Sequence, residues 1–119
     1  MAKIFRFRDV PTAALLRRKI ALTSRLTIPP DAIRASLVRQ HLTCGKKNCR
    51  CRRGRKHGPF EYLVQSLAAG ETQKFLLRTV EQRYRAGIGI AAYANLQGKL
   101  EELSQINTEL LRRGALSTG

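Results

Sequence analysis

Three cysteines, Cys44, Cys49 and Cys51, lie within eight residues of a 119-residue chain that has no others. His57 follows six positions after the third cysteine, so the spacing is C-x4-C-x-C-x5-H. Three cysteines this close together cannot form the disulfide framework of a small secreted domain. A chain that gathers these four side chains must form a tight loop, which we interpret as a metal site in a reducing compartment.

The ligand types in this loop favour zinc, because structural zinc sites bind four thiolate sulfurs or imidazole nitrogens in a tetrahedron. The predicted ligands are Cys44, Cys49, Cys51 and His57. Iron–sulfur ligation by the three thiolates is an alternative, and His41 is an alternative fourth ligand. We expect Gly45, Gly54 and Gly58 to let the backbone turn around the ion.

The same segment carries the most concentrated positive charge in a chain of net charge +15. Residues 32–60 contain nine basic and no acidic side chains, whereas residues 61–119 contain seven basic and six acidic ones. Seven of the basic residues lie on or beside the predicted metal loop: Lys46, Lys47, Arg50, Arg52, Arg53, Arg55 and Lys56. This pattern predicts a nucleic-acid partner, with DNA favoured over RNA, bound mainly through its phosphates.

The sequence has few residues suited to catalysis. It contains only eight acidic residues, and Glu101 and Glu102 are adjacent on an expected helix, so their side chains diverge. It has no Gly-rich phosphate loop and no H-E-x-x-H motif, and we expect no enzymatic activity. No apolar run approaches the length of a membrane span, and the N-terminus lacks the apolar core of a signal peptide, so we expect a cytoplasmic protein without membrane association.

The first part of the chain, residues 1–32, is expected to be a basic tail, or a short edge strand, followed by a helix. Residues 12–26 have the helical pattern, with Pro11 suited to the first turn and Pro29-Pro30 ending the helix. The expected apolar stripe of this helix consists of Leu15, Leu16, Ile20 and Leu22.

The middle part, residues 33–77, is expected to hold the metal loop and a β-hairpin. Residues 33–43 fit either a helix capped by Asp31 or a strand, and we favour the strand because metal loops commonly begin at a strand end. Residues 60–66 and 72–77 alternate like two strands, with Ala69-Gly70 at the turn. The fold class is therefore α+β, with a small antiparallel sheet between two helical segments.

Residues 78–119 are expected to form a long C-terminal helix. Gly87 and Gly89 each cost about 1 kcal/mol relative to alanine, so they indicate a kink or a close approach of another backbone. After them a 3-4-3-4-3 spacing runs through Tyr93, Leu96, Leu100, Leu103, Asn107 and Leu110. This short coiled-coil-like seam predicts binding to a second copy or to a larger protein, with Asn107 fixing the register.

The metal loop also resembles a family of small bacterial proteins known mainly as a domain of unknown function. The shared residues are Ser36-Leu37-Val38, Cys44-Gly45-Lys46, Asn48-Cys49-Arg50-Cys51, His57-Gly58-Pro59-Phe60 and Tyr62-Leu63. The chain departs from the family at Phe60, where tyrosine is frequent, and at Ala35, where glycine is common. The resemblance implies that His57 belongs to the ligand set and that the gene belongs to the setting of transposons and other mobile elements.

Two functional hypotheses follow from these patterns. In the first, the chain is a zinc-stabilised nucleic-acid-binding accessory protein, probed by reversing the charge of Arg52, Arg53 and Arg55. In the second, it is an adaptor whose C-terminal helix docks on a transposase or recombinase, and the basic charge only keeps the complex near DNA.

Overall fold

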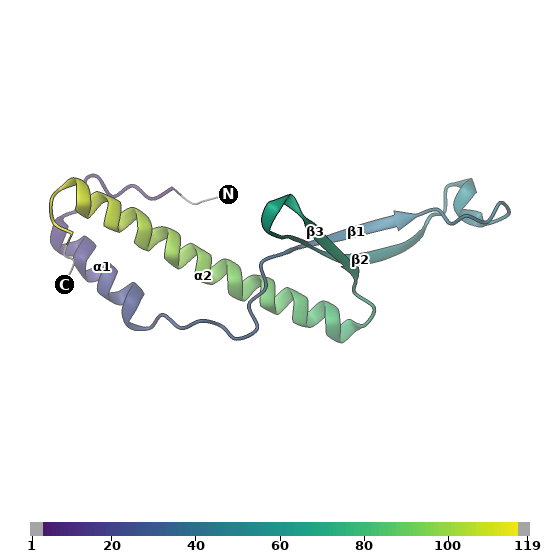
Figure 1. The fold of residues 1–119 in the computed structure, drawn as a ribbon, viewed down its shortest axis with the longest axis horizontal. Helices are drawn as coiled ribbons and strands as arrows, with labels where there is room; N and C mark the ends of the chain where they lie inside the picture. The colour runs from purple at the N-terminus through teal and green to yellow at the C-terminus, as the bar shows by residue number, and fades with distance from the viewer. Residues whose placement is uncertain (1–3, 117–119) are drawn as a thin grey trace. The chain divides into compact units, whose positions relative to one another are not determined.

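A computed structural model describes residues 4–116, which divide into two compact units (Figure 1). We call residues 4–30 and 93–116 the helical unit, and residues 31–92 the sheet unit. The long helix α2, Val80–Arg112, begins in the sheet unit and ends in the helical unit. No helix within residues 4–116 is long and apolar enough to cross a membrane.

The helical unit is built on α1, Thr12–Ser24, which begins directly after Pro11 as expected. One side of α1 packs against the last turns of α2. The buried core consists of Leu15, Leu22, Ile106 and Leu110. The expected stripe was wrong for Leu16 and Ile20, which are 39% and 66% exposed. Because α1 packs against a single helix, it buries only the narrow face that carries residues seven positions apart.

The N-terminal segment is fastened to the helical unit by Arg113. Its guanidinium donates to the carbonyl oxygens of Phe7 and Arg8, both at 3.0 Å, and to Thr12 Oγ1 at 3.1 Å. The same group forms an ion pair with Glu109 at 2.7 Å. One side chain thereby joins the segment before α1, the start of α1 and the end of α2.

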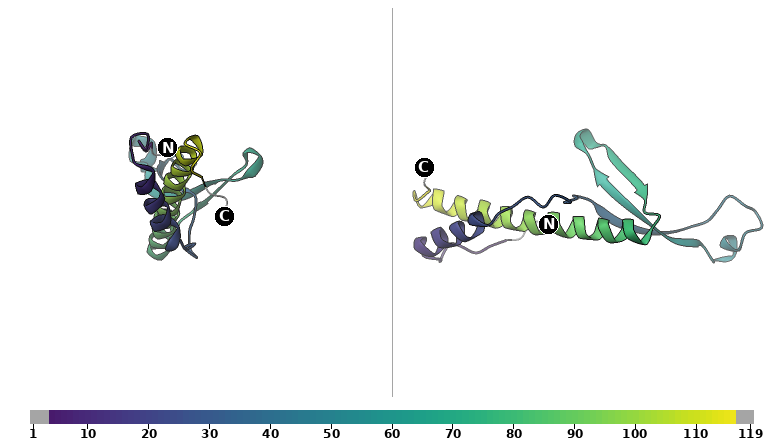
Figure 2. Two further views of the ribbon diagram at one scale, coloured as in Figure 1. Left: turned by 90° about the vertical axis from the view of Figure 1, so that its left-hand side faces the viewer. Right: turned by 90° about the horizontal axis from the view of Figure 1, so that it is seen from below.

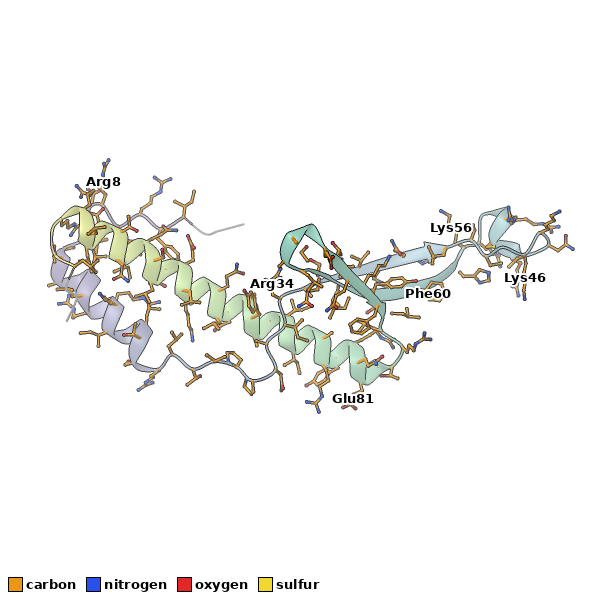
Figure 3. All side chains as sticks on the ribbon, in the orientation of Figure 1. Arg8, Arg34, Lys46, Lys56, Phe60 and Glu81 are labelled. Carbon is orange, nitrogen blue, oxygen red and sulfur yellow. The ribbon has the colours of Figure 1, made fainter. Side chains whose placement is uncertain are left out.

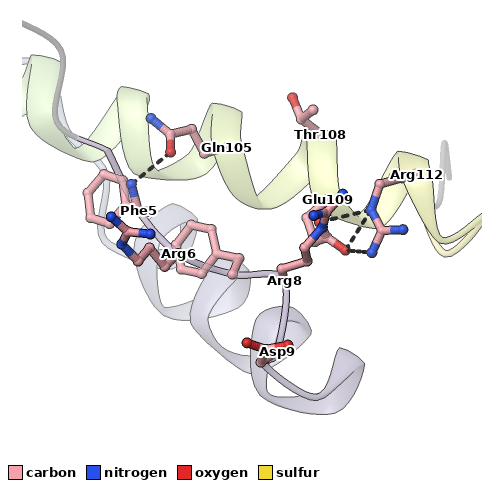
Figure 4. Close-up of a pocket in the computed structure, with 9 residues that line it drawn as sticks. Phe5, Arg6, Arg8, Asp9, Gln105, Thr108, Glu109 and Arg112 are labelled. Atoms are coloured by element: carbon pink, nitrogen blue, oxygen red, sulfur yellow. Dashed lines mark hydrogen bonds and ion pairs between the residues drawn. The ribbon is translucent and has the colours of Figure 1, made fainter.

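A hollow of about 490 Å³ lies between residues 5–9 and the end of α2 (Figure 4). Arg6, Arg8 and Arg112 line it, together with Glu109. Glu109 accepts hydrogen bonds from Arg112 and Arg113, which lower the pKa of its carboxyl group to about 2. Of the two acids that line this hollow, Asp9 and Glu109, Glu109 is thus already paired with cations of the same unit.

The sheet unit contains three antiparallel strands in the order β1-β2-β3. Strand β1 spans Ser36–Leu42, β2 spans His57–Ser66 and β3 spans Thr72–Leu76. The strand favoured for residues 33–43 and the hairpin with its turn at Ala69-Gly70 are both confirmed, as is the α+β class. Strand β3 pairs only with Tyr62–Ser66, so the first half of β2 is paired with β1 alone.

Of the two glycines near the start of α2, Gly89 lies where another part of the backbone comes close, whereas a Cβ atom at Gly87 would meet no atom within 4 Å. The buried residues Leu63, Leu77 and Ala86 form the core of the sheet unit, and Ile33 packs against them. The backbone N–H of Ile33 donates to the carbonyl oxygen of Gly89 at 3.0 Å. A Cβ atom at position 89 would lie 2.6 Å from the carbonyl oxygen of Asp31, so this position is a close backbone approach of the kind that the sequence suggested.

Candidate metal centre

The pairing of β1 with β2 closes the loop that carries the cysteines. Leu42 pairs with His57, after a register shift between Gln40 and Leu42. The intervening residues 43–56, which we call the basic loop, leave β1 and return at the first residue of β2 (Figure 2). The first cysteine therefore lies two residues after a strand pair whose other member is the histidine.

Gly58 allows the two strands to meet at this point. Its φ is +125°, and a Cβ atom there would lie 2.8 Å from the carbonyl oxygen of Gln40 and 3.0 Å from the backbone nitrogen of Phe60. Gly54 also has a positive φ, as expected for a turn, whereas Gly45 does not. The return of the chain therefore depends on Gly54 and Gly58, and Gly45 lies at a bend directly after Cys44, as expected.

Backbone and thiol hydrogen bonds order the interior of the basic loop. The N–H of Cys49 donates to the carbonyl oxygen of Lys46 at 3.4 Å, and the N–H of Arg52 donates to the carbonyl oxygen of Cys49 at 3.1 Å. The latter bond starts a short 3-10 helix, Arg50–Arg53. The N–H of Cys44 donates to the sulfur of Cys51 at 3.2 Å. These bonds hold the backbone in a conformation that brings the thiols of Cys44, Cys49 and Cys51 close together.

The four predicted ligand side chains form one cluster. Their ligand atoms, from Cys44, Cys49, Cys51 and His57, all lie within 4.8 Å of one another. The sulfurs of Cys44 and Cys51 are 3.5 Å apart, and the sulfur of Cys49 is 3.0 Å from His57 Nε2. Ligands around a tetrahedral zinc ion would be separated by about 3.8 Å for two sulfurs and about 3.6 Å for sulfur and nitrogen. The cluster therefore fits a metal ion of this size.

The surroundings of the cysteines favour a thiolate at Cys44. The backbone N–H of Lys46 lowers the pKa of the Cys44 thiol to about 6, helped by hydrogen bonds from Cys49, His57 and Cys51. The backbone N–H of Cys51 lowers the pKa of Cys49, but hydrogen bonds with the thiols of Cys44 and Cys51 outweigh it, so the net pKa is raised. Of Cys44 and Cys49, Cys44 is thus the thiol that ionises more readily.

The burial of the cluster matches a structural site. Cys51 is 2% exposed, Cys44 and Cys49 are half-buried, and His57 is exposed. His41 is exposed on β1 and is not part of the cluster among residues 4–116, so the alternative fourth ligand is not supported. Four protein ligands would fill a tetrahedral site completely and leave no position for a reacting water.

The seven predicted phosphate-binding cations lie on the same loop as this cluster, and all of them are exposed. Figure 3 labels two of them, Lys46 and Lys56. The ion pairs among residues 4–116 involve Arg18, Arg39, Arg85, Arg112 and Arg113. No cation of the basic loop forms an ion pair with any carboxylate in this part of the chain. Their charge is therefore not neutralised by the described protein.

Two hollows adjoin His57 on the basic loop. One, of about 320 Å³, is lined by Leu42, Thr43, Cys44, His57 and Phe60. The other, of about 360 Å³, is lined by Cys49, Arg50, Arg55, Lys56 and His57. The sequence predicted Phe60 only as the first residue of a strand, and its place beside the cluster was missed. A spacing of three residues in a regular strand puts side chains on opposite faces, so the local pattern gave no signal that Phe60 lies beside His57.

The predicted seam on α2 has two different environments. Leu110 is fully buried against α1, and Leu103 packs against the same core, so these residues lie inside the helical unit. This corrects the interpretation of Leu110 as part of a partner surface. Leu100 is 48% exposed, and Tyr93 and Leu96 are half-buried. Asn107 Oδ1 is buried without a hydrogen-bond donor among residues 4–116.

Comparison with known proteins places the chain in a family. A family model for a domain of unknown function, DUF6788, matches residues 12–85, which include the whole metal cluster. No curated protein and no solved structure matches the chain. The match covers more than half of the sequence and confirms the expected membership of a family without known activity, whereas the loop motif and the mobile-element setting stay predictions. The chain therefore belongs to the DUF6788 family, a domain of unknown function.

Proposed function

We propose that the chain is a zinc-stabilised nucleic-acid-binding accessory protein whose preferred target is DNA. The observation that carries this proposal is the set of seven exposed cations on the basic loop without an ion-pair partner among residues 4–116. Phosphates would supply the missing anions. Zinc, bound by Cys44, Cys49, Cys51 and His57, would supply a fixed centre around which the loop is ordered.

The physical role of the metal in this proposal is preorganisation. A free basic tail must lose conformational entropy when it binds phosphates, whereas a loop already closed by a metal and by the Leu42–His57 pair loses less. Because four protein ligands would occupy all the coordination positions of the metal, we propose no catalytic role for the site. The resemblance of the loop suggests that the nucleic acid belongs to a mobile element.

The proposal is tested by titrating labelled duplex DNA with the zinc-loaded full chain at several salt concentrations. If about six phosphates are neutralised, the slope of log affinity against log salt is about −5. Changing Arg52, Arg53 and Arg55 to Glu should abolish binding at moderate salt. A flat salt response, or unchanged binding by this variant, would contradict the proposal.

The matched control changes Arg17, Lys19 and Arg25 to Glu. It alters the net charge by the same amount but leaves the basic loop intact, since all three residues lie on or directly after α1. Binding should weaken far less than in the loop variant. Equal losses in the two variants would mean that total charge, and not the loop, controls binding.

A second candidate function, an adaptor that docks through α2, is favoured by one observation. Leu100 is 48% exposed at the centre of the predicted seam, while Leu103 packs within the helical unit. Leu100→Asp should then abolish self-association or capture of a transposase-type partner without changing zinc content. Loss of function in this variant, with the loop charges dispensable, would favour the adaptor over the nucleic-acid binder.

A further inference from the structure

The basic loop offers two chemically different hollows that share one wall. The apolar hollow has the side chains of Leu42, Cys44 and Phe60 around it, and the cationic hollow has Arg50, Arg55 and Lys56. His57 lines both. A ligand that spans this wall needs an apolar, flat part on one side and an anionic part on the other.

We infer that the loop binds single-stranded nucleic acid, with one unstacked base in the apolar hollow beside Phe60 and the adjoining phosphates over the cationic hollow. This inference rests on the proposed nucleic-acid-binding function and deepens it by naming the form of the target. A nucleotide has the required parts, since its base is a flat ring and its phosphate carries the charge.

The apolar hollow distinguishes single strands from duplexes. Bases within a duplex are stacked and paired, and extruding one costs a few kcal/mol. Bases of a single strand are free to stack on aromatic side chains, which contributes about 1–3 kcal/mol per base. A duplex would use only the cations of the loop and leave the hollow beside Phe60 empty.

The exposure of Leu42 supports a ligand at this position. Leu42 is 41% exposed, yet it lies at the end of a strand whose continuation carries seven cations. An apolar protein partner would have to desolvate these cations without supplying anions, which is unfavourable. A nucleotide covers the apolar side chains and pairs the cations together, so charge complementarity selects it.

The positions of Phe60 and His57 are fixed by the sheet. Phe60 pairs with Gln40 across β1–β2, and His57 pairs with Leu42. Between them Gly58 lies against the carbonyl oxygen of Gln40, which leaves no space for a larger residue. The ring of Phe60 is therefore held beside the cluster by backbone pairing before any ligand arrives.

The test compares three probes with the zinc-loaded full chain at one salt concentration: a short oligothymidylate, an abasic strand of the same length, and a duplex. The oligothymidylate should bind about 5- to 150-fold more tightly than the abasic strand, the range expected for one stacked base. Phe60→Leu should remove most of this difference, Phe60→Tyr should keep it, and duplex binding should be unchanged in both.

Phe75→Leu is the matched control, because Phe75 is a 48% exposed phenylalanine of β3 in the same sheet and does not line the hollow. It should leave all three affinities unchanged. Equal binding of thymidylate and abasic strands by the unmodified chain, with duplex binding intact, would overturn the inference and leave the proposed function standing. Failure of all three probes to bind would overturn both.

Discussion

The helical unit and the basic loop use arginine in opposite ways. In the helical unit, Arg18 forms an ion pair with Glu102 at 2.5 Å. Arg113 pairs with Glu109 and donates to two carbonyl oxygens of the N-terminal segment and to Thr12 at the start of α1. On the basic loop, no cation has a carboxylate partner among residues 4–116. Arginine therefore stabilises the fold in the helical unit and stays available to a ligand on the basic loop. The net charge of the chain does not distinguish these two uses.

The two regions also differ in what keeps them ordered. The helical unit buries leucine and isoleucine side chains completely, with Leu15, Ile106 and Leu110 at most 1% exposed. Within the basic loop, Cys51 is the one buried residue. A metal ion there would replace the apolar core that so short a loop cannot build.

The largest effect is expected from removing a metal ligand. His57→Asn should lower zinc affinity by about 70- to 900-fold, because four ligands share a binding free energy of about 10–16 kcal/mol. The measurement is competition with a chromophoric chelator. His41→Asn is the matched control, since His41 lies exposed on β1 outside the cluster. A larger loss of zinc affinity in the control variant would show that His41, and not His57, is the fourth ligand.

In the helical unit, the largest effect is expected from the core. Leu110→Ala should lower the free energy of unfolding by about 2–5 kcal/mol, because it leaves a cavity beside α1. Leu111→Ala, at a neighbouring position that is 65% exposed, should change it by less than about 0.5 kcal/mol. Urea unfolding followed by helix circular dichroism measures both. Similar values for the two variants would contradict the helical core.

A smaller effect of opposite signs is expected at the two glycines of α2. Gly89→Ala should destabilise the sheet unit by about 1–3 kcal/mol, because the new Cβ would meet the carbonyl oxygen of Asp31 at 2.6 Å. Gly87→Ala meets no atom within 4 Å and should stabilise the helix by about 0.5–1 kcal/mol. Thermal unfolding of the zinc-loaded chain compares them, and stabilisation by both would refute the close backbone approach.

The smallest effect is a pH dependence in the helical unit. The folded pKa of Glu109 is lowered from 4.5 to about 2 by Arg112 and Arg113. As pH falls through this window, the unfolded chain takes up a proton that the folded chain does not, so stability is lost. Glu109→Gln should make thermal stability less dependent on pH between about 5 and 2. Glu81→Gln, which removes a 74% exposed carboxylate, serves as the control and should not flatten the profile.

Local patterns were sufficient to predict the elements and the metal cluster. Cys44, Cys49, Cys51 and His57 are so close in the sequence that their side chains were expected to meet in one tight loop, as they do. The alternation of apolar and polar residues indicated the strands on either side of this loop. Pro11 marked the start of α1, because proline acts within its own turn, whereas the helix ends at Ser24, before it reaches Pro29. Features that depend only on residues close together in the sequence can therefore be predicted without knowledge of the fold.

Features that depend on distant residues were harder to predict. The seam on α2 was interpreted as a partner surface, yet Leu110 is buried by α1, which lies nearly a hundred residues earlier. Spacing shows that a helix face is apolar but not what covers it. The place of Phe60 beside Cys44 was missed for a related reason, because it follows from the register of β1 with β2.

The pairing of Leu42 with His57 has a consequence for how the metal and the strands influence each other. The pair holds the histidine next to the first cysteine, which raises the effective concentration of imidazole around an ion bound by the thiolates. Linkage is reciprocal, so an ion that binds more tightly to the closed loop must stabilise the strand ends by the same free energy. Zinc bound as proposed would thereby control how far the β1–β2 ladder extends.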